Sequence, residues 1–381
     1  MSAESDGIIA ERLAHNQSFW LRAPVRGPLL GVAVNITFPL LTFADNLQDG
    51  EVTPDQIQPE AFLEDWDRAH TEATARGEDL MSVASPFAGI PWMEAIAGCT
   101  VRMVPGSGSA WAEYPEGFAI NPRQVRFDPA NAWLRKLVEC TQALREHAAG
   151  RYPVGAPILR GVSDMIAAIL GSNQMVLAYY DRPELIRELS ERCTEIWQGV
   201  ACALAAAKGS FMGGSCADRR RVWGRGTSLL YQDDAVALAS PRFFREFFLP
   251  RIAEVLRPYT NTMIHLHSAS LPIMARDLCM VPELQAIEVL LDPSGPQVLD
   301  LLETFREILR HKALVICGEM TALQVRACIE ALPGAGLCLQ PKAGSSAEAD
   351  LLWREMTAGR QALAEDAAEQ QPCIKGDDHE V

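Results

Sequence analysis

The chain has 381 residues, of which 48% are hydrophobic and 22% charged, so it holds enough apolar material for a large folded core. Its formal net charge is −15, from 34 basic and 49 acidic residues. Nucleic acid binding needs clustered positive charge, which argues against such a partner. The nearest cluster is Arg219, Arg220 and Arg221 with Arg225, which fits a solvated loop or an anchor for an anionic ligand.

Sequence features near the termini and at the cysteines narrow the protein class further. No stretch approaches the roughly 20 consecutive apolar residues of a membrane helix. The N-terminus is acidic and lacks the basic and apolar regions of a signal peptide, which predicts a cytoplasmic location. Ten cysteines occur without a Cys-x-x-Cys pair, which favours buried, reduced thiols over disulfides.

Short apolar runs alternate with longer helical patterns, which indicates a parallel sheet covered by helices. The predicted strands are residues 29–35, 158–162, 228–231, 262–267, 286–291, 314–317 and 336–340. The predicted fold class is therefore α/β, a single (β/α)₈ barrel over residues 1–365. The Gly-, Pro- and Trp-rich segment 86–128 predicts an N-terminal elaboration over one end of the barrel, and the polar residues 366–381 predict a disordered tail.

Several helices between these strands carry clear signals. Apolar residues on one face predict helices over 183–207 and 297–311. Ser240 followed by Pro241 is typical of a helix start, with a capping hydroxyl and a proline in the first turn. A further helix is predicted to begin after Thr321.

Two histidines and one cysteine indicate a metal site. Residues i and i+2 of a strand point to the same side, so His265 and His267 should both point into the barrel near the end where barrel enzymes place their chemistry. Cys338, on a later strand, would add a third and softer ligand. Three protein ligands with one open position are typical of catalytic zinc. Glu288 interrupts an apolar run, and because an unpaired buried carboxylate is costly, it should have either a partner or the metal.

Simpler interpretations exist for each of these residues, since paired histidines are often hydrogen-bonded structural residues and a lone cysteine often fills a core. Asp164, Asp233, Asp234 and Glu319 lie at or just after strands and could line a pocket. Glu319 is favoured because Gly318 permits a close backbone approach. Asp233 and Asp234 could equally bond neighbouring loops. The predicted catalytic residues are Glu319, Asp234 and Asp164.

Two parts of the chain resemble the uroporphyrinogen decarboxylase superfamily. One part comprises residues 164–171 and 179–185, and the other comprises residues 231–234 and 240–250. The resemblance covers most of the length. It implies a (β/α)₈ barrel, and the superfamily includes the zinc-dependent corrinoid methyltransferases.

The methyltransferase branch binds zinc through a His-x-Cys pair and a distant Cys, and His265, His267 and Cys338 lie at the corresponding places. His267 departs from this pattern, since a neutral imidazole replaces a thiolate and should leave a bound thiol or water more acidic. The related cobalamin-independent methionine synthase adds a Glu ligand, at a spacing that Glu288 roughly matches. The Arg-Gln-Ala-Gly-Arg-Tyr-like stretch of the decarboxylase branch is absent from residues 26–35.

The resemblance therefore implies a methyltransferase in which zinc activates a substrate thiol and the corrinoid is supplied by a separate partner protein. The small molecule would accept or donate the methyl group, and a homodimer is left open. A second hypothesis is a metal-free decarboxylase-like lyase in which Arg221 or Arg225 binds a carboxylate. A third is a non-catalytic binding module, which predicts that His265, His267 and Cys338 lie apart or are otherwise bonded.

Overall fold

The computed structural model describes residues 3–23, 27–34, 50–87, 89–103, 110–114 and 120–369. The predicted strand end at Asn35, parts of segment 86–128 and residues 370–381 of the predicted tail lie outside these ranges. Residues 366–369 belong to the helix α14 (Ser346–Glu369).

The central sheet is parallel, with the strand order β1-β12-β11-β10-β9-β8, and β2 also pairs with β12. The strands are β1 (Leu29–Leu30), β2 (Ala33–Val34), β8 (Ser228–Gln232), β9 (Asn261–His267), β10 (Ala286–Leu291), β11 (Ala313–Gly318) and β12 (Leu337–Ala343). All but β2 are almost entirely buried, as continuous apolar runs predict. The predicted strands are confirmed at 228–231, 262–267, 286–291, 314–317 and 336–340.

Two further segments continue the sheet beyond β8. Arg160 pairs with Gln232 and Ala84 pairs with Val154, each in an isolated parallel bridge. The Leu30 carbonyl accepts a hydrogen bond of 3.1 Å from the backbone of residue 79. Backbone contacts thus lead from β8 round to β1, as in a (β/α)₈ barrel, although no continuous strand ladder joins these segments within the described ranges.

The predicted strand over 158–162 is wrong in its extent, because α6 (Val162–Leu170) begins inside it. The Asp233 carboxylate accepts hydrogen bonds from the backbone amides of Ser163 and Asp164 at 2.9 and 3.3 Å. These bonds satisfy amides of the first helical turn and start the helix directly after the bridge.

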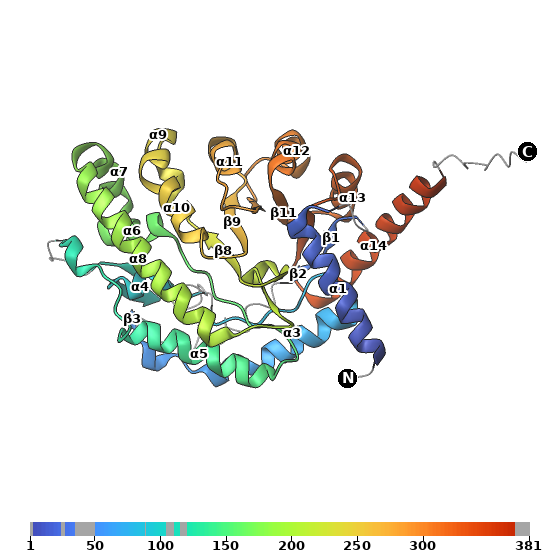
Figure 1. Cartoon of the computed structure of the whole chain (residues 1–381), viewed down its shortest axis with the longest axis horizontal. Helices are drawn as coiled ribbons and strands as arrows, with labels where there is room; N and C mark the ends of the chain where they lie inside the picture. Colours follow the sequence, from blue (N-terminus) through green and yellow to red (C-terminus); the bar gives the residue numbers. More distant parts are fainter. Residues whose placement is uncertain are drawn as a thin grey trace, which may run out of the picture.

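Helices cover the outside of the sheet (Figure 1). They are α1 (Ala3–Leu21), α3 (Leu63–Arg76), α5 (Ala132–Ala148), α6, α7 (Ser172–Asp181), α8 (Pro183–Lys208), α10 (Leu249–Leu256), α11 (Leu271–Cys279), α12 (Leu302–His311), α13 (Ala322–Ala331) and α14. The helices predicted over 183–207, over 297–311 and after Thr321 are confirmed. Among the described residues, no helix is both long and apolar enough to span a membrane.

The predicted helix start at Ser240 is confirmed, since its hydroxyl accepts a hydrogen bond from the backbone of Phe243. After α9 (Pro241–Phe243) the chain forms a π-helical turn over Phe244–Phe248, and the amide of Leu249 donates to the carbonyl of its first residue. Pro250 has no N–H to offer an α-helical bond, which accounts for the wider turn at this point.

Segment 86–128 contributes β4 (Thr100–Met103) and β5 (Ala110–Glu113) to a small antiparallel sheet, whose remaining strand β3 (Gly50–Val52) lies outside the bounds of the predicted elaboration. The short helix α4 (Trp92–Ile96) packs against α5, α6 and α8. This unit lies outside the parallel sheet, beside α8 in Figure 1.

The core has an outer layer between sheet and helices and a smaller inner cluster enclosed by the strands. Phe19 and Trp20 of α1 belong to this inner cluster, together with Leu29, Val315 and Cys338 from the strands. The Trp20 indole donates to a backbone carbonyl at 3.0 Å. Apolar side chains thus fill part of the barrel interior.

Gly318 at the end of β11 is required by its conformation and by space. Its φ is +126°, and an added Cβ would lie 2.9 Å from the Cβ of Leu291. We expect Gly318→Ala to lower the free energy of unfolding by about 1–3 kcal/mol. In α14, a Cβ added at Gly359 would lie 3.9 Å from the Arg326 side chain, so Gly359→Ala should leave the free energy of unfolding unchanged or raise it by up to about 1 kcal/mol. Urea denaturation measures both variants, and equal effects would contradict the prediction.

Candidate metal centre

Three potential metal ligands converge at the carboxyl ends of β8 and β9. His265 and His267 project to the same side of β9, and Asp234 lies two residues beyond β8. The Asp234 Oδ1 atom is 3.8 Å from His265 Nε2 and 3.7 Å from His267 Nε2. One ligand atom from each residue can be chosen so that all lie within 4.8 Å of one another. The carboxylate of Asp234 therefore lies beside the predicted histidine pair, and the three residues form the candidate metal site.

A second pair of carboxylates orients the two imidazoles. His265 Nδ1 bonds Glu288 Oε2, and His267 Nδ1 bonds Asp292 Oδ1 at 2.5 Å. With the Nδ1 hydrogen donated to a carboxylate, each Nε2 lone pair is directed toward the side on which Asp234 lies. Burial lowers the pKa of His265, which favours the neutral imidazole that metal ions require.

Glu288 is completely buried and has three partners. Its Oε2 bonds His265, while its Oε1 accepts from Arg220 Nη2 at 2.7 Å and from the Cys317 thiol at 2.6 Å. Burial opposes ionisation, but the Arg220 guanidinium and the His265 ring hold the pKa of Glu288 well below its usual range. The expectation that Glu288 has a partner is confirmed. Its place is behind His265 rather than among the converging ligand atoms.

Asp234 is held in place from two sides. Its Oδ2 atom accepts a 2.6 Å hydrogen bond from Gln232 Nε2. Its backbone amide and that of Ala235 donate to the Asp164 carboxylate at 3.1 and 2.8 Å. Burial and the neighbouring carboxylates of Asp233 and Asp234 raise the pKa of Asp164. Asp164 therefore supports the loop that carries Asp234.

Asp233 forms hydrogen bonds to a neighbouring segment, which agrees with the structural interpretation of this residue rather than with a place in the pocket. It accepts hydrogen bonds from the Ser163 hydroxyl at 2.5 Å and from the Tyr231 hydroxyl at 2.9 Å. Burial raises the pKa of Asp233 to about 6. Its contacts fix the start of α6 against the end of β8.

Cys338 and Glu319 lie apart from the converging atoms. Cys338 pairs in register with Leu29 and Val315 within the inner apolar cluster, and burial raises the pKa of its thiol to about 12. Its sulfur accepts a hydrogen bond from Gln340 Nε2 at 3.5 Å. Glu319 is exposed just beyond β11. Neither belongs to the metal-ligand group found among the described residues.

Sequence reasoning did not single out Asp292 or Gln232, and it named Arg219 only within the basic cluster that fits a solvated loop or an anchor for an anionic ligand. Asp292 directly follows β10, so the rule that selected Asp234, a polar residue just after a strand, applies to it as well. Arg219 donates to Gln232 Oε1 at 2.5 Å, and Gln232 in turn bonds Asp234. Nothing in the local sequence signals that contact.

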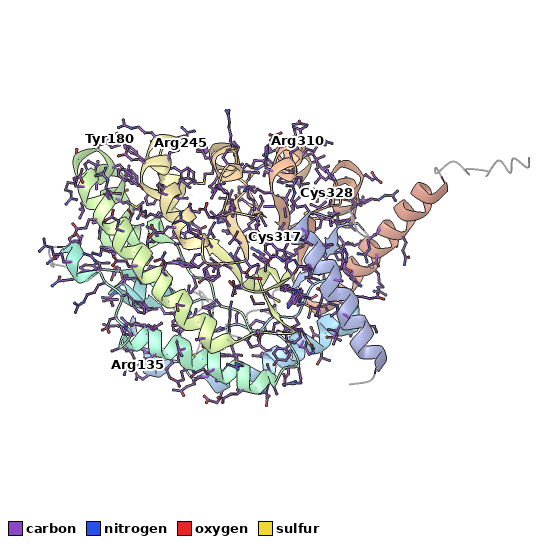
Figure 2. All side chains as sticks on the ribbon, viewed as in Figure 1. Arg135, Tyr180, Arg245, Arg310, Cys317 and Cys328 are labelled. Atoms are coloured by element: carbon purple, nitrogen blue, oxygen red, sulfur yellow. The ribbon has the colours of Figure 1, made fainter. Side chains whose placement is uncertain are left out.

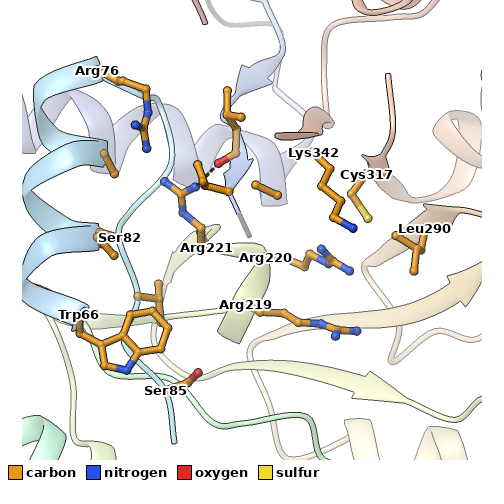
Figure 3. Close-up of a pocket in the computed structure, with 17 residues that line it drawn as sticks. Trp66, Arg76, Ser82, Ser85, Arg219, Arg220, Arg221, Leu290, Cys317 and Lys342 are labelled. Atoms are coloured by element: carbon orange, nitrogen blue, oxygen red, sulfur yellow. Dashed lines mark hydrogen bonds between the residues drawn. The ribbon is translucent and has the colours of Figure 1, made fainter. Parts of the chain in front are cut away.

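A cavity of about 360 Å³ lies beside these residues. Figure 3 shows Trp66 and Arg76 of α3 on one side and Leu290 and Cys317 on the other. Cys317 lies inside the ring of helices in Figure 2, whereas Tyr180 and Arg245 lie on outer helices. The Leu290 Cα pairs in register with that of His267, which connects the cavity to the candidate metal centre.

The fold and the site together define an α/β barrel protein with a candidate metal centre at the carboxyl ends of its strands. Among solved structures, the chain is similar to a methyltransferase from Methanosarcina mazei, with a TM-score of 0.65 and 12% identity over 93% of this chain and 99% of that one. It also matches the homocysteine methyltransferase MmuM from Escherichia coli in its metallated form, with a TM-score of 0.42 and 13% identity over 86% and 96% of the two chains.

At 12% identity the likeness to the Methanosarcina mazei structure shows the fold alone, and the barrel fold implied by the sequence resemblance is confirmed. No protein-family model and no curated protein matches the chain. The chemistry must therefore be argued from the site itself.

We expect Glu288→Gln to lower the free energy of unfolding by about 3–5 kcal/mol near neutral pH, because the buried Arg220 loses its counter-charge. Because folding lowers the pKa of Glu288, its carboxylate contributes fully to the free energy of unfolding above the ordinary glutamate pKa of 4.5. This contribution is lost as the pH falls through the lowered pKa. The difference in the free energy of unfolding between wild type and Glu288→Gln should therefore become smaller in acid. Urea denaturation across pH measures this difference.

The matched control is Glu303→Gln, since Glu303 is exposed and bonds Arg306 at 3.2 Å on the surface of α12. This variant should change stability by less than about 1 kcal/mol at every pH. A gap for Glu288→Gln that widens in acid, or that matches the control, would contradict the assigned role of Glu288.

Proposed function

We propose that this chain is a zinc-dependent methyltransferase whose metal is held by His265, His267 and Asp234. The methyl group would move between a corrinoid on a separate partner protein and a thiol or similar small-molecule acceptor. One observation carries the proposal: two imidazole nitrogens and one carboxylate oxygen converge, with the imidazoles oriented by further carboxylates. The fold shared with a methyltransferase supports it.

The three residues fit a zinc ion. Ligands bonded to zinc at about 2.0–2.1 Å lie roughly 3.3 Å apart in a tetrahedral site. The separations of 3.7 and 3.8 Å between the histidine nitrogens and Asp234 Oδ1 are close to that value. Two histidines and one carboxylate are also a set that catalytic zinc uses, with one position left for substrate. The set differs from the predicted one in having Asp234 where Cys338 was expected.

Zinc bound there would supply a Lewis acid that favours the thiolate form of a substrate thiol at neutral pH. The chain itself would contribute orientation and shielding. Glu288 and Asp292 keep Nε2 of both histidines available, and Gln232 holds the Asp234 carboxylate. Apolar walls such as Leu290 would limit water beside the thiolate. The corrinoid partner, the cytoplasmic location and the homodimer stay predictions.

The hypothesis of a metal-free lyase requires Arg221 or Arg225 to bind a substrate carboxylate, and neither side chain is placed to do so. Arg221 bonds Glu78 at 2.6 Å and the carbonyls of Met81 and Val32 at 2.7 and 2.9 Å. Arg225 is exposed on β7 (Trp223–Arg225) and is not among the described residues that line the cavity. The arrangement of the site therefore favours the metal-dependent hypothesis.

Metal analysis of purified variants separates the two ligand sets. We expect about one equivalent of zinc on the wild-type chain, and an affinity more than about 100-fold lower in His265→Ala and Asp234→Ala, since each removes a ligand. Cys338→Ala should retain zinc, because Cys338 lies in the apolar cluster. Loss of zinc in Cys338→Ala but not in Asp234→Ala would restore the set predicted from sequence. Iron in place of zinc, or less than half an equivalent of metal in wild type, would overturn the proposal.

Methyl transfer can be measured with free methylcobalamin as the donor and a panel of small thiols as acceptors. The zinc-loaded chain should demethylate methylcobalamin in a thiol-dependent reaction that is followed by absorbance. Asp234→Ala should lower kcat/KM by at least about 100-fold, since the metal would be lost. Zinc-loaded protein that is inactive with every thiol, or activity unchanged after metal removal, counts against methyl transfer to a thiol.

A further inference from the structure

Another cavity lies at the amino ends of the strands, the end of the barrel opposite to the candidate metal centre. It has a volume of about 280 Å³ and lies between the last turns of α5 and α8 and the strand β6 (Gly214–Cys216). Its lining includes Ser215, which accepts hydrogen bonds of 2.7 and 2.8 Å from the amide and the hydroxyl of Ser228, the first residue of β8. The candidate metal ligands lie at the carboxyl ends of β8 and β9. The two sites are therefore separate.

Two basic side chains line this cavity, Arg145 of α5 and Lys208 of α8. The Lys208 side chain is 11% exposed, and its Nζ atom lies 3.6 Å from Oδ1 of Asp218, which is longer than a hydrogen bond. In the described part of the chain, no other carboxylate lies within ion-pair distance of either cation. The Asp218 carboxylate also accepts a 2.8 Å hydrogen bond from the amide of Ala156. Two positive charges thus face one negative charge.

Arg145 and Ser210 keep unbonded donors beside the cavity. Arg145 donates through Nη1 to the carbonyl of Ala207, near the end of α8, at the long distance of 3.4 Å. Its guanidinium lies close to the backbone of Gly209, where an added Cβ would be 3.0 Å from Cζ. Among the described residues, the other guanidinium nitrogens and the Ser210 hydroxyl have no hydrogen-bond partner. The cavity thus offers donors that a ligand can use.

The two cations also have a simpler role, because α5 and α8 pack side by side and both end at this cavity (Figure 1). The carbonyl end of a helix carries partial negative charge, which nearby Arg and Lys side chains offset. That role uses one nitrogen of Arg145 and leaves the rest of its guanidinium unbonded. It also gives no reason for a cavity beside the cations that Phe211 and Val154 line with apolar surface.

We propose that this cavity binds a phosphate group, as inorganic phosphate or as part of a small phosphomonoester, through Arg145, Lys208 and the Ser210 hydroxyl. The oxygens of a phosphate accept several hydrogen bonds at once, and a guanidinium can donate to two of them. The negative charge of the phosphate offsets the positive charge that Asp218 leaves unbalanced. The organic part of a phosphomonoester would lie against Phe211. This site does not depend on the proposed function.

The test is calorimetric titration of the full-length, zinc-free chain with inorganic phosphate and with glycerol 3-phosphate, at an ionic strength held constant with chloride. We expect saturable binding with a Kd of about 1 mM or lower. Glycerol is the neutral control and should not bind. Tighter binding of glycerol 3-phosphate identifies the ligand as a phosphomonoester, and tighter binding of phosphate identifies it as the free ion.

Three variants test the assigned donors. Arg145→Gln should weaken phosphate binding at least about tenfold, and Ser210→Ala about threefold. Both residues are exposed, so these variants should fold, which circular dichroism checks. The matched control is Arg135→Gln, which changes an exposed arginine of the same helix outside the cavity lining, labelled in Figure 2, and should leave binding unchanged.

Hydrogen exchange locates the bound phosphate without mutation. Phosphate should slow the exchange of backbone amides in residues 145–154 and 208–216, which surround the cavity. No saturable binding, equal affinities of Arg145→Gln and Arg135→Gln, or protection confined to the cavity beside the candidate metal centre would overturn the inference. The proposed function fails separately, through absence of zinc or of methyl transfer, and phosphate binding would survive that failure.

Discussion

The buried carboxylate of Glu288 is the interaction on which the rest of the site depends. An ionised carboxylate in a protein interior is costly unless it is paired and hydrogen-bonded, and here Arg220, His265 and Cys317 bond its two oxygens. Each partner is fixed in turn: the imidazole directs Nε2 toward the metal centre, and Arg220 and Cys317 line the cavity. One buried charge thus holds together β9, β10, β11 and the turn Asp218–Arg220.

The two histidines differ in exposure, which gives the centre a closed and an open side. The side chain of His265 is 1% exposed, whereas those of His267 and Asp234 are both 37% exposed. Asp292 holds His267 in place, and its carboxylate is in turn fixed by the hydroxyl of Ser268 at 3.0 Å. His265 is therefore the fixed ligand, while a substrate or a docking partner would approach from the side of His267 and Asp234.

Local periodicity explains both what the sequence revealed and what it could not. Alternation along β9 placed His265 and His267 together, and the position of Asp234 after a buried strand predicted that it could line the pocket. Alternation gives the direction of a side chain but not its height in the barrel, which depends on the stagger between strands. Cys338 was therefore grouped with the histidines, although it lies in the apolar cluster beside Leu29 and Val315. The strand over 158–162 was overextended for a related reason, since a carboxylate about 70 residues away caps the helix that ends it.

Formal charges connect the ligand set to the ionisation of a thiol bound at the candidate metal centre. In the formal count Glu288 neutralises Arg220 and Asp292 offsets Lys342. Asp234 would balance one of the two charges of a zinc ion, while Arg219 adds one more. Two positive charges then remain, and this excess would favour the thiolate form of a thiol bound at the metal. The set of His265, His267 and Asp234 also has one anionic ligand fewer than the His-Cys-Cys pattern of the family that the sequence resembles. A metal with fewer anionic ligands acidifies a bound thiol more strongly. The same feature would thus favour ionisation of the thiol.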